Sequence, residues 1–213
     1  NIEKFLKNPD KPVLAIIGGS KVSTKLNILK KLTEKVDMII LGGGIANTFL
    51  LSSNLPIGKS LAEKDMVSDV KEILRFAEKN DVYIPLPKDV ICQNSLNIKN
   101  KNVNNVQEED SIKDIGSKTS RIYEKLIEEA ATILWNGPVG VFEDALFENG
   151  TKNIAKSIGN SKALTIAGGG DTISAIEKFI SMEEIDYVST GGGAFLEFLE
   201  GKKLPGIEII KKL

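Results

Sequence analysis

The chain has 213 residues, 41% of them hydrophobic, with 28 basic and 29 acidic side chains and no histidine. This size and apolar content support a globular core, and the balanced charge argues against a surface built for nucleic acid or for an anionic membrane. The absence of histidine excludes serine–histidine hydrolases and most zinc sites, and the single cysteine, Cys92, excludes an internal disulfide. We interpret Cys92 as a small core residue on a strand, and we expect a cytoplasmic protein.

The chain opens on Asn1 without an initiator methionine, and residues 1–6 read like the last turns of a helix. We therefore expect a piece of a longer protein. No apolar run is long enough for a membrane span, and no signal segment opens the chain.

Strand-like and helix-like patterns alternate along the chain, which is the signature of βαβ units. We predict strands at 13–17, 36–41, 82–86 and 132–135. Helices are predicted at 21–34, 45–50, 64–79 and 119–130 from their apolar spacing. The Asn-rich stretch 93–109 reads as a surface excursion or an irregular hairpin. These patterns predict a single domain over 1–213, a doubly wound α/β fold with a mostly parallel sheet and helices on both faces, as in a Rossmann-like three-layer sandwich.

Four glycine clusters each follow a short apolar run and precede a helix-like pattern. Since the carboxyl ends of parallel strands share one edge of the sheet, these turns predict a ligand site there. Glycine allows close approach to a ligand, and helix N-termini favour anions, so a nucleotide fits best. The clusters are Gly18 and Gly19; Gly42, Gly43 and Gly44; Gly168, Gly169 and Gly170; and Gly191, Gly192 and Gly193.

Two standard nucleotide motifs are absent. Gly58, Lys59 and Ser60 resemble the end of a P-loop, but Ser53 stands where its first glycine should be, and no strand precedes it. None of the glycine triplets completes the G-x-G-x-x-G dinucleotide fingerprint, so a standard NAD domain is not expected.

Charged residues beside these turns suggest phosphate and metal chemistry. Lys21 and Lys25 are four residues apart, which places both on one face if the helix starts at 21; a solvated lysine face is the alternative. Asp171 and Thr172 follow a glycine triplet, where they could cap a helix or place a magnesium ligand beside a phosphate. Glu143, at the end of the run from Trp135, could lie on the surface or bind a ribose.

Together these segments resemble the carboxyl-terminal half of phosphoglycerate kinase. The resemblance covers nearly the whole chain, and its most specific runs are Trp135 through Glu143 and Gly168 through Thr172. It implies a Mg²⁺-dependent ATP/ADP site and reversible phosphoryl transfer between 1,3-bisphosphoglycerate and ADP. The family's amino-terminal domain, which binds 3-phosphoglycerate, is absent from this sequence. The fragment alone is therefore expected to be inactive and monomeric.

The resemblance also assigns roles by position. Lys21, Gly169 and Gly192 would contact the migrating phosphoryl group, Asp171 would hold magnesium, and Glu143 would bind the ribose. Two departures matter: Lys113 lies in a stretch that is usually more apolar near the adenine, and Phe195 stands where many members carry serine. The remaining nucleotide-binding residues implied are Gly19, Ser20, Lys25, Gly43, Gly44, Leu61, Asn136, Pro138, Gly168, Gly170, Thr172, Gly191 and Gly193.

Two other hypotheses remain open at this point. The chain could be a stand-alone nucleotide-binding module without catalysis, or an unrelated α/β oxidoreductase that binds its cofactor at the same sheet edge.

Overall fold

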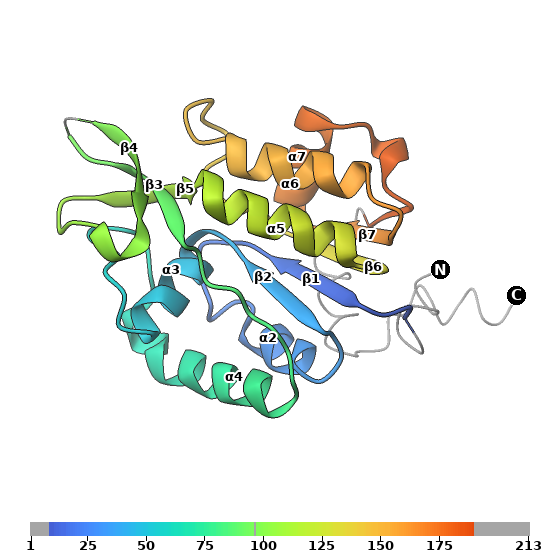
Figure 1. The fold of residues 1–213 in the computed structure, drawn as a ribbon, viewed down its shortest axis with the longest axis horizontal. Helices are drawn as coiled ribbons and strands as arrows, with labels where there is room; N and C mark the ends of the chain where they lie inside the picture. Colours follow the sequence, from blue (N-terminus) through green and yellow to red (C-terminus); the bar gives the residue numbers. More distant parts are fainter. Residues whose placement is uncertain (1–8, 96, 190–213) are drawn as a thin grey trace, which may run out of the picture.

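A computed structural model describes residues 9–95 and 97–189, in which a five-stranded parallel sheet forms the centre (Figure 1). Its strand order is β2-β1-β6-β7-β8, and every neighbouring pair is parallel. Because β2 lies on one side of β1 and β6 on the other, the strand order reverses between β1 and β6. Open α/β sheets bind ligands at such a switch point, outside the carboxyl ends of the strands. The strands are β1 (Val13–Ile17), β2 (Met38–Leu41), β6 (Thr132–Asn136), β7 (Leu164–Gly168) and β8 (Tyr187–Ser189).

Helices cover both faces of this sheet, as predicted. Figure 1 shows α2, α3 and α4 on one face and α5, α6 and α7 on the other. Alternate residues of each central strand belong to two different core clusters: the cluster of Ala15 includes residues of α2, α3 and α4, and that of Ile16 includes residues of α5, α6 and α7. Burial on both faces explains why these strands read as continuous apolar runs. The helices are α2 (Leu26–Leu32), α3 (Gly43–Ser52), α4 (Val67–Lys79), α5 (Ser117–Glu129), α6 (Asn149–Gly159) and α7 (Gly170–Phe179), with short 3₁₀ turns at Lys64–Met66, Val103–Asn105 and Met182–Glu184.

The first helix is shorter than predicted. It begins at Leu26, not at residue 21, so Lys21 precedes it and the shared helix face inferred for Lys21 and Lys25 is wrong. Side-chain hydrogen bonds replace the first helical turn: the Thr24 hydroxyl donates to the nearby Lys21 carbonyl, and the Ser23 hydroxyl and amide both donate to the distant Glu63. Such side-chain bonds compete with helix formation.

The predicted strand at 82–86 is also wrong. Within that segment only Tyr83 bridges to Met38 at the edge of β2. Pro85 and the following Pro87 lack the backbone N–H that a longer ladder requires, which ends the pairing after one bridge.

The Asn-rich stretch forms part of a second, antiparallel sheet of order β4-β3-β5, so the prediction of a hairpin is confirmed. Cys92 is 1% exposed on the central strand, as expected for a core residue, and burial raises the pKa of its thiol to about 11. The three strands are β3 (Asp89–Gln93), β4 (Ile98–Asn102) and β5 (Ser111–Ile115).

The fourth glycine cluster, Gly191 to Gly193, and Phe195 lie outside the described residues, as does the segment 1–6. Among the helices of the described residues, none is long and apolar enough to cross a membrane.

Candidate functional site

The loops that follow β1, β2 and β6 pack directly against one another at the carboxyl edge of the sheet. A Cβ added to Gly18 or to Gly42 would overlap the carbonyl oxygen of Pro138. Likewise, a Cβ on Gly44 would overlap the carbonyl oxygen of Ser20. Glycine is therefore required at these turns, because the neighbouring backbones approach too closely to leave room for a side chain.

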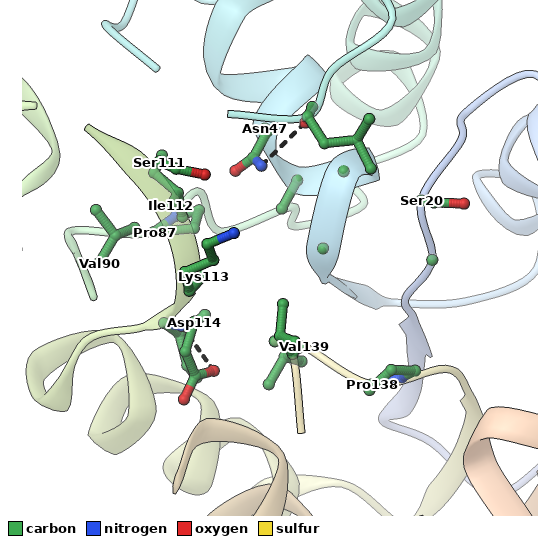
Figure 2. Close-up of a pocket in the computed structure, with 18 of the residues that line it drawn as sticks. Ser20, Asn47, Pro87, Val90, Ser111, Ile112, Lys113, Asp114, Pro138 and Val139 are labelled. Carbon is green, nitrogen blue, oxygen red and sulfur yellow. Dashed lines mark hydrogen bonds between the residues drawn. The ribbon is translucent and has the colours of Figure 1, made fainter. Parts of the chain in front are cut away.

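Beside these loops lies a cavity of about 370 Å³ (Figure 2). One wall is the start of α3, the opposite wall is β5, and the loop after β6 forms a third side. A pocket of this size is in the usual range for small-molecule sites. Its lining residues are Gly19, Ser20, Gly43, Gly44, Ala46, Asn47, Leu61, Pro87, Val90, Ser111, Ile112, Lys113, Asp114, Ile115, Pro138, Val139, Gly140, Val141, Glu143 and Asp171.

Eight of the residues predicted for the nucleotide site line this cavity. They come from segments of the chain that are far apart in sequence, so the fold brings them together. The eight are Gly19, Ser20, Gly43, Gly44, Leu61, Pro138, Glu143 and Asp171.

Lys25 joins the ends of two strands. Its Nζ donates to the Gly18 carbonyl at 2.6 Å, and to the backbone carbonyl and side-chain oxygen of Asn136 at 3.1 and 2.6 Å. Burial lowers the pKa of Lys25 to about 8, although the nearby carboxylate of Asp171 opposes that shift. Lys25 thus holds β1 and β6 together at the switch point and places a cation within electrostatic range of Asp171.

Replacing Lys25 with methionine is expected to lower the free energy of unfolding by about 2 kcal/mol, because the Gly18 carbonyl and the Asn136 side-chain oxygen lose their donor, whereas the Asn136 carbonyl keeps the Gly18 N–H. The matched control is Lys30→Met, which removes a half-exposed ion pair with Glu72 that contributes at most about 1 kcal/mol. Urea unfolding of both variants measures the difference; equal losses would contradict the joining role of Lys25.

Asn136 and Thr172 continue this polar network between β6 and β7. The Asn136 amide donates to the Gly168 carbonyl at 2.6 Å. The Thr172 hydroxyl donates to the same carbonyl at 2.9 Å and accepts the Gly137 N–H at 2.8 Å. Both side chains are buried and outside the cavity lining, so they position the loops.

Asp171 carries the exposed carboxylate in the first turn of α7, at the rim of the cavity. Among the described residues, no group of three His, Cys, Asp or Glu side chains could hold a metal ion by itself. One carboxylate suits Mg²⁺ that takes its other ligands from phosphate and water. The residues present therefore fit a magnesium ion that arrives with a nucleotide.

The other predicted residues lie beside the cavity or outside the described part. Lys21 is exposed and follows Ser20, which lines the cavity. Gly169 and Gly170 form the turn from β7 into α7, and an added Cβ on Gly170 would meet no atom within 4 Å. The turn is therefore open at Gly170, whereas a Cβ on Gly169 would meet the Asn136 amide nitrogen at 2.8 Å. Gly191, Gly192 and Gly193 lie outside the described residues.

The resemblance placed the stretch around Lys113 near the adenine, but the residues of β5 by themselves did not indicate a cavity wall, and the part played by Asn47 of α3 was missed. Asn47 is buried, and its amide donates to the Leu61 carbonyl at 3.0 Å. Lys113 interrupts the run from Ser111 to Ile115, so the pattern of that run did not indicate a cavity wall. The available signal was the buried helix face of α3, on which a polar Asn47 needs a partner.

Asp114 separates this cavity from a second one of about 280 Å³. Its carboxylate accepts the N–H groups of Gly150 and Ile115 at 2.7 and 2.8 Å. Burial nevertheless raises the pKa of Asp114 to about 7, against those two hydrogen bonds. Gly150 lies in the first turn of α6, and the buried Asp89 accepts the N–H of Thr119 in the first turn of α5, so both helix ends that border the second cavity have internal partners.

The family model described as phosphoglycerate kinase matches residues 1–202. The phosphoglycerate kinases of Francisella philomiragia and of Francisella tularensis subsp. novicida are 52% and 51% identical over 216 residues, which cover 99% of this chain and 55% of each relative. The chain therefore spans about half the length of the curated relatives it matches.

Two solved structures resemble the whole chain. The structure of phosphoglycerate kinase from Coxiella burnetii has a TM-score of 0.95 and 47% identity, and covers 99% of this chain with 55% of its own. That from Pyrococcus horikoshii has a TM-score of 0.84 and 29% identity, with 99% and 54% covered.

Proposed function

Because the chain belongs to the phosphoglycerate kinase family, we propose that it binds Mg-ADP and Mg-ATP in the cavity at the carboxyl edge of its parallel sheet. In this proposal it is the nucleotide-binding half of an enzyme that reversibly transfers a phosphoryl group between 1,3-bisphosphoglycerate and ADP. The observation that carries the proposal is the meeting of Gly19, Gly44, Glu143 and Asp171 around one cavity beside the switch point.

The residues that line the cavity suit different parts of a nucleotide. Asp171, in the first turn of α7 and within electrostatic range of Lys25, suits the phosphates. The apolar side chains of Leu61 and Val139 suit a flat base. Glu143 offers a carboxylate to the ribose hydroxyls.

Phosphoryl transfer needs positioning and stabilisation of charge more than covalent help from the protein. This requirement explains how a chain without histidine can serve such a reaction. Lys21 and the backbone N–H groups around Gly169 would orient the phosphates and balance their charge, and Gly192 would do so from outside the described residues. Bound magnesium, held by Asp171, would neutralise charge on the phosphate oxygens.

Isothermal titration calorimetry tests the proposal with Mg-ADP and NAD as separate ligands. We expect saturable binding of Mg-ADP at one site per chain and no heat from NAD. Binding of NAD without Mg-ADP would instead favour the oxidoreductase hypothesis and contradict the proposal.

Catalysis is a separate question, because 3-phosphoglycerate would bind to the part of the relatives that this chain does not span. A coupled assay with 3-phosphoglycerate and Mg-ATP is expected to show no meaningful turnover by the 213-residue chain. Adding the missing half of the family's length should restore turnover; if it does not, the chain is better described as a stand-alone nucleotide-binding module.

A further inference from the structure

Glu143 borders the cavity from an exposed turn in the loop after β6. Its carboxylate makes no hydrogen bond or ion pair within residues 9–95 and 97–189. The place of this carboxylate is therefore set by the backbone that carries it and by the segments that hold that backbone.

Lys178 holds this backbone at the peptide group immediately before Glu143. Its Nζ donates to the carbonyl oxygen of Phe142 at 2.8 Å. Because a peptide group is planar, fixing the Phe142 carbonyl also fixes the direction in which the chain continues to the Cα of Glu143. The buried Phe142 ring contacts the ring of Phe179 edge-on, with 6.3 Å between the two centroids. Both the carbonyl and the side chain of Phe142 are thus tied to the last turn of α7.

The Lys178 ammonium group also joins α7 to the start of α6, which covers the same face of the sheet (Figure 1). It forms an ion pair with Glu148 at 2.9 Å. An ammonium group has three donors, so it can serve the carbonyl and the carboxylate together. Since α7 carries Asp171 in its first turn and Lys178 in its last, one helix supports both the proposed magnesium ligand and the turn of Glu143.

We propose that Lys178 is a positioning residue that aims the Glu143 carboxylate at the ribose, so that the chain selects nucleotides by their ribose hydroxyls. The inference rests on the proposed function, in which Glu143 binds those hydroxyls. It adds a residue that does not line the cavity and acts through the Phe142 carbonyl.

The effect follows from the geometry of hydrogen bonds. No other donor among the residues that the structure describes reaches the Phe142 carbonyl, so loss of Lys178 leaves this peptide group free to turn toward water. Turning the peptide group displaces Glu143. A hydroxyl-to-carboxylate hydrogen bond weakens steeply as its distance and angle depart from the ideal, so the ribose contact is lost first.

The test measures by calorimetry how tightly the 213-residue chain binds Mg-ADP and Mg-2′,3′-dideoxyADP, which lacks both ribose hydroxyls. Since hydrogen bonds to a charged group are strong, the unaltered chain should bind Mg-ADP roughly 10- to 150-fold more tightly than the dideoxy nucleotide. Lys178→Met should lower this ratio at least about fivefold by weakening Mg-ADP binding, and should change the affinity for the dideoxy nucleotide by less than about threefold.

Lys152→Met is the matched control. Lys152 pairs with the same Glu148 carboxylate at 3.4 Å, and its side chain is 38% exposed against 37% for Lys178. Each substitution removes one of the two cations beside Glu148 and keeps an unbranched side chain, but only Lys178→Met also frees the Phe142 carbonyl. Lys152→Met should therefore leave the ratio unchanged. In a chain that carries Glu143→Ala, Lys178→Met should lower the ratio no further, because the carboxylate that it displaces is gone.

The inference is overturned if Lys178→Met leaves the ratio unchanged, if Lys152→Met lowers it as much, or if Lys178→Met lowers it equally in the chain that carries Glu143→Ala. It is also overturned if the unaltered chain binds both nucleotides with equal affinity; the proposed nucleotide site would then stand without its ribose contact. If neither nucleotide binds, the proposed function fails, and the inference fails with it.

Discussion

Replacing Gly18 with alanine is expected to lower the free energy of unfolding by about 3 kcal/mol or more, because the new methyl group would overlap backbone atoms of Gly137 and Pro138. Backbone atoms at the end of a buried strand cannot move aside as a flexible side chain can. For a chain of this size, the melting temperature should fall by roughly 6–12 °C. Thermal unfolding followed by circular dichroism measures this change.

Gly170→Ala is the matched control, since Gly170 is the first residue of α7 and an added Cβ meets nothing within 4 Å. Alanine is the better helix former, so this variant should be as stable as the unaltered chain or more stable by up to about 1 kcal/mol. Gly18→Ala also reports on the site, because it should weaken Mg-ADP binding by displacing the Pro138 loop. A Gly18→Ala variant that melts with the unaltered chain would contradict the close packing of these loops.

The second large effect concerns Asp114 and pH. Burial raises its pKa from 3.8 to about 7, so between these two values the folded chain holds a proton that the unfolded chain has released. The contribution of Asp114 to the free energy of unfolding therefore falls as pH rises through that window. Because each tenfold change in proton affinity is worth about 1.4 kcal/mol, the whole contribution amounts to roughly 4 kcal/mol.

In the variant Asp114→Asn the asparagine side chain cannot ionise, so the free energy of unfolding of this variant should lack the pH-dependent contribution of Asp114. Relative to the asparagine variant, the unaltered chain should lose roughly 4 kcal/mol between about pH 4 and 7.5, whatever constant cost the lost hydrogen bond adds. Urea unfolding at several pH values measures the difference.

Asp110→Asn provides a control of opposite sign. Burial by itself raises the pKa of Asp110, but hydrogen bonds from Lys101, the Gln107 N–H and Asn94, together with the charge of Lys101, hold the pKa below its ordinary value. The contribution of that carboxylate should therefore be present above about pH 4 and be lost as pH falls.

The Asp114 prediction would be contradicted if the free energy of unfolding of Asp114→Asn and of the unaltered chain changed in parallel with pH, because Asp114 would then titrate normally.

The parallel sheet and its covering helices were predictable because their signals are local. Val70, Ile73 and Ala77 follow the helical period, and all three are buried on α4. The run from Val13 to Ile17 is apolar throughout because both of its faces are covered. The glycine turns could be placed at one sheet edge for the same reason: parallel strands bring their carboxyl ends together.

The parts that failed depend on contacts between distant segments. The start of α2 is set by Ser23 bonding to Glu63, forty residues away, which no helical period reveals. The joining role of Lys25 depends on backbone carbonyls of β1 and β6, and backbone atoms carry no sequence signal. β5 reaches the cavity through partners that are distant in sequence: it pairs with β3, Ser111 bridges to Gly58, and the Ile112 N–H donates to the Ser60 hydroxyl. Its five residues mix apolar and charged side chains, so their pattern does not indicate these contacts.

Binding of Mg-ADP in the cavity between α3, β5 and the loop after β6 is most directly measured by NMR. The ¹⁵N-labelled chain is titrated with Mg-ADP, and its amide chemical shifts are followed. We expect the largest changes on Gly44, Val139 and Asp171. Changes centred instead on Ser117 and Asn153, which line the second cavity, or no changes at saturating Mg-ADP, would contradict binding at this site.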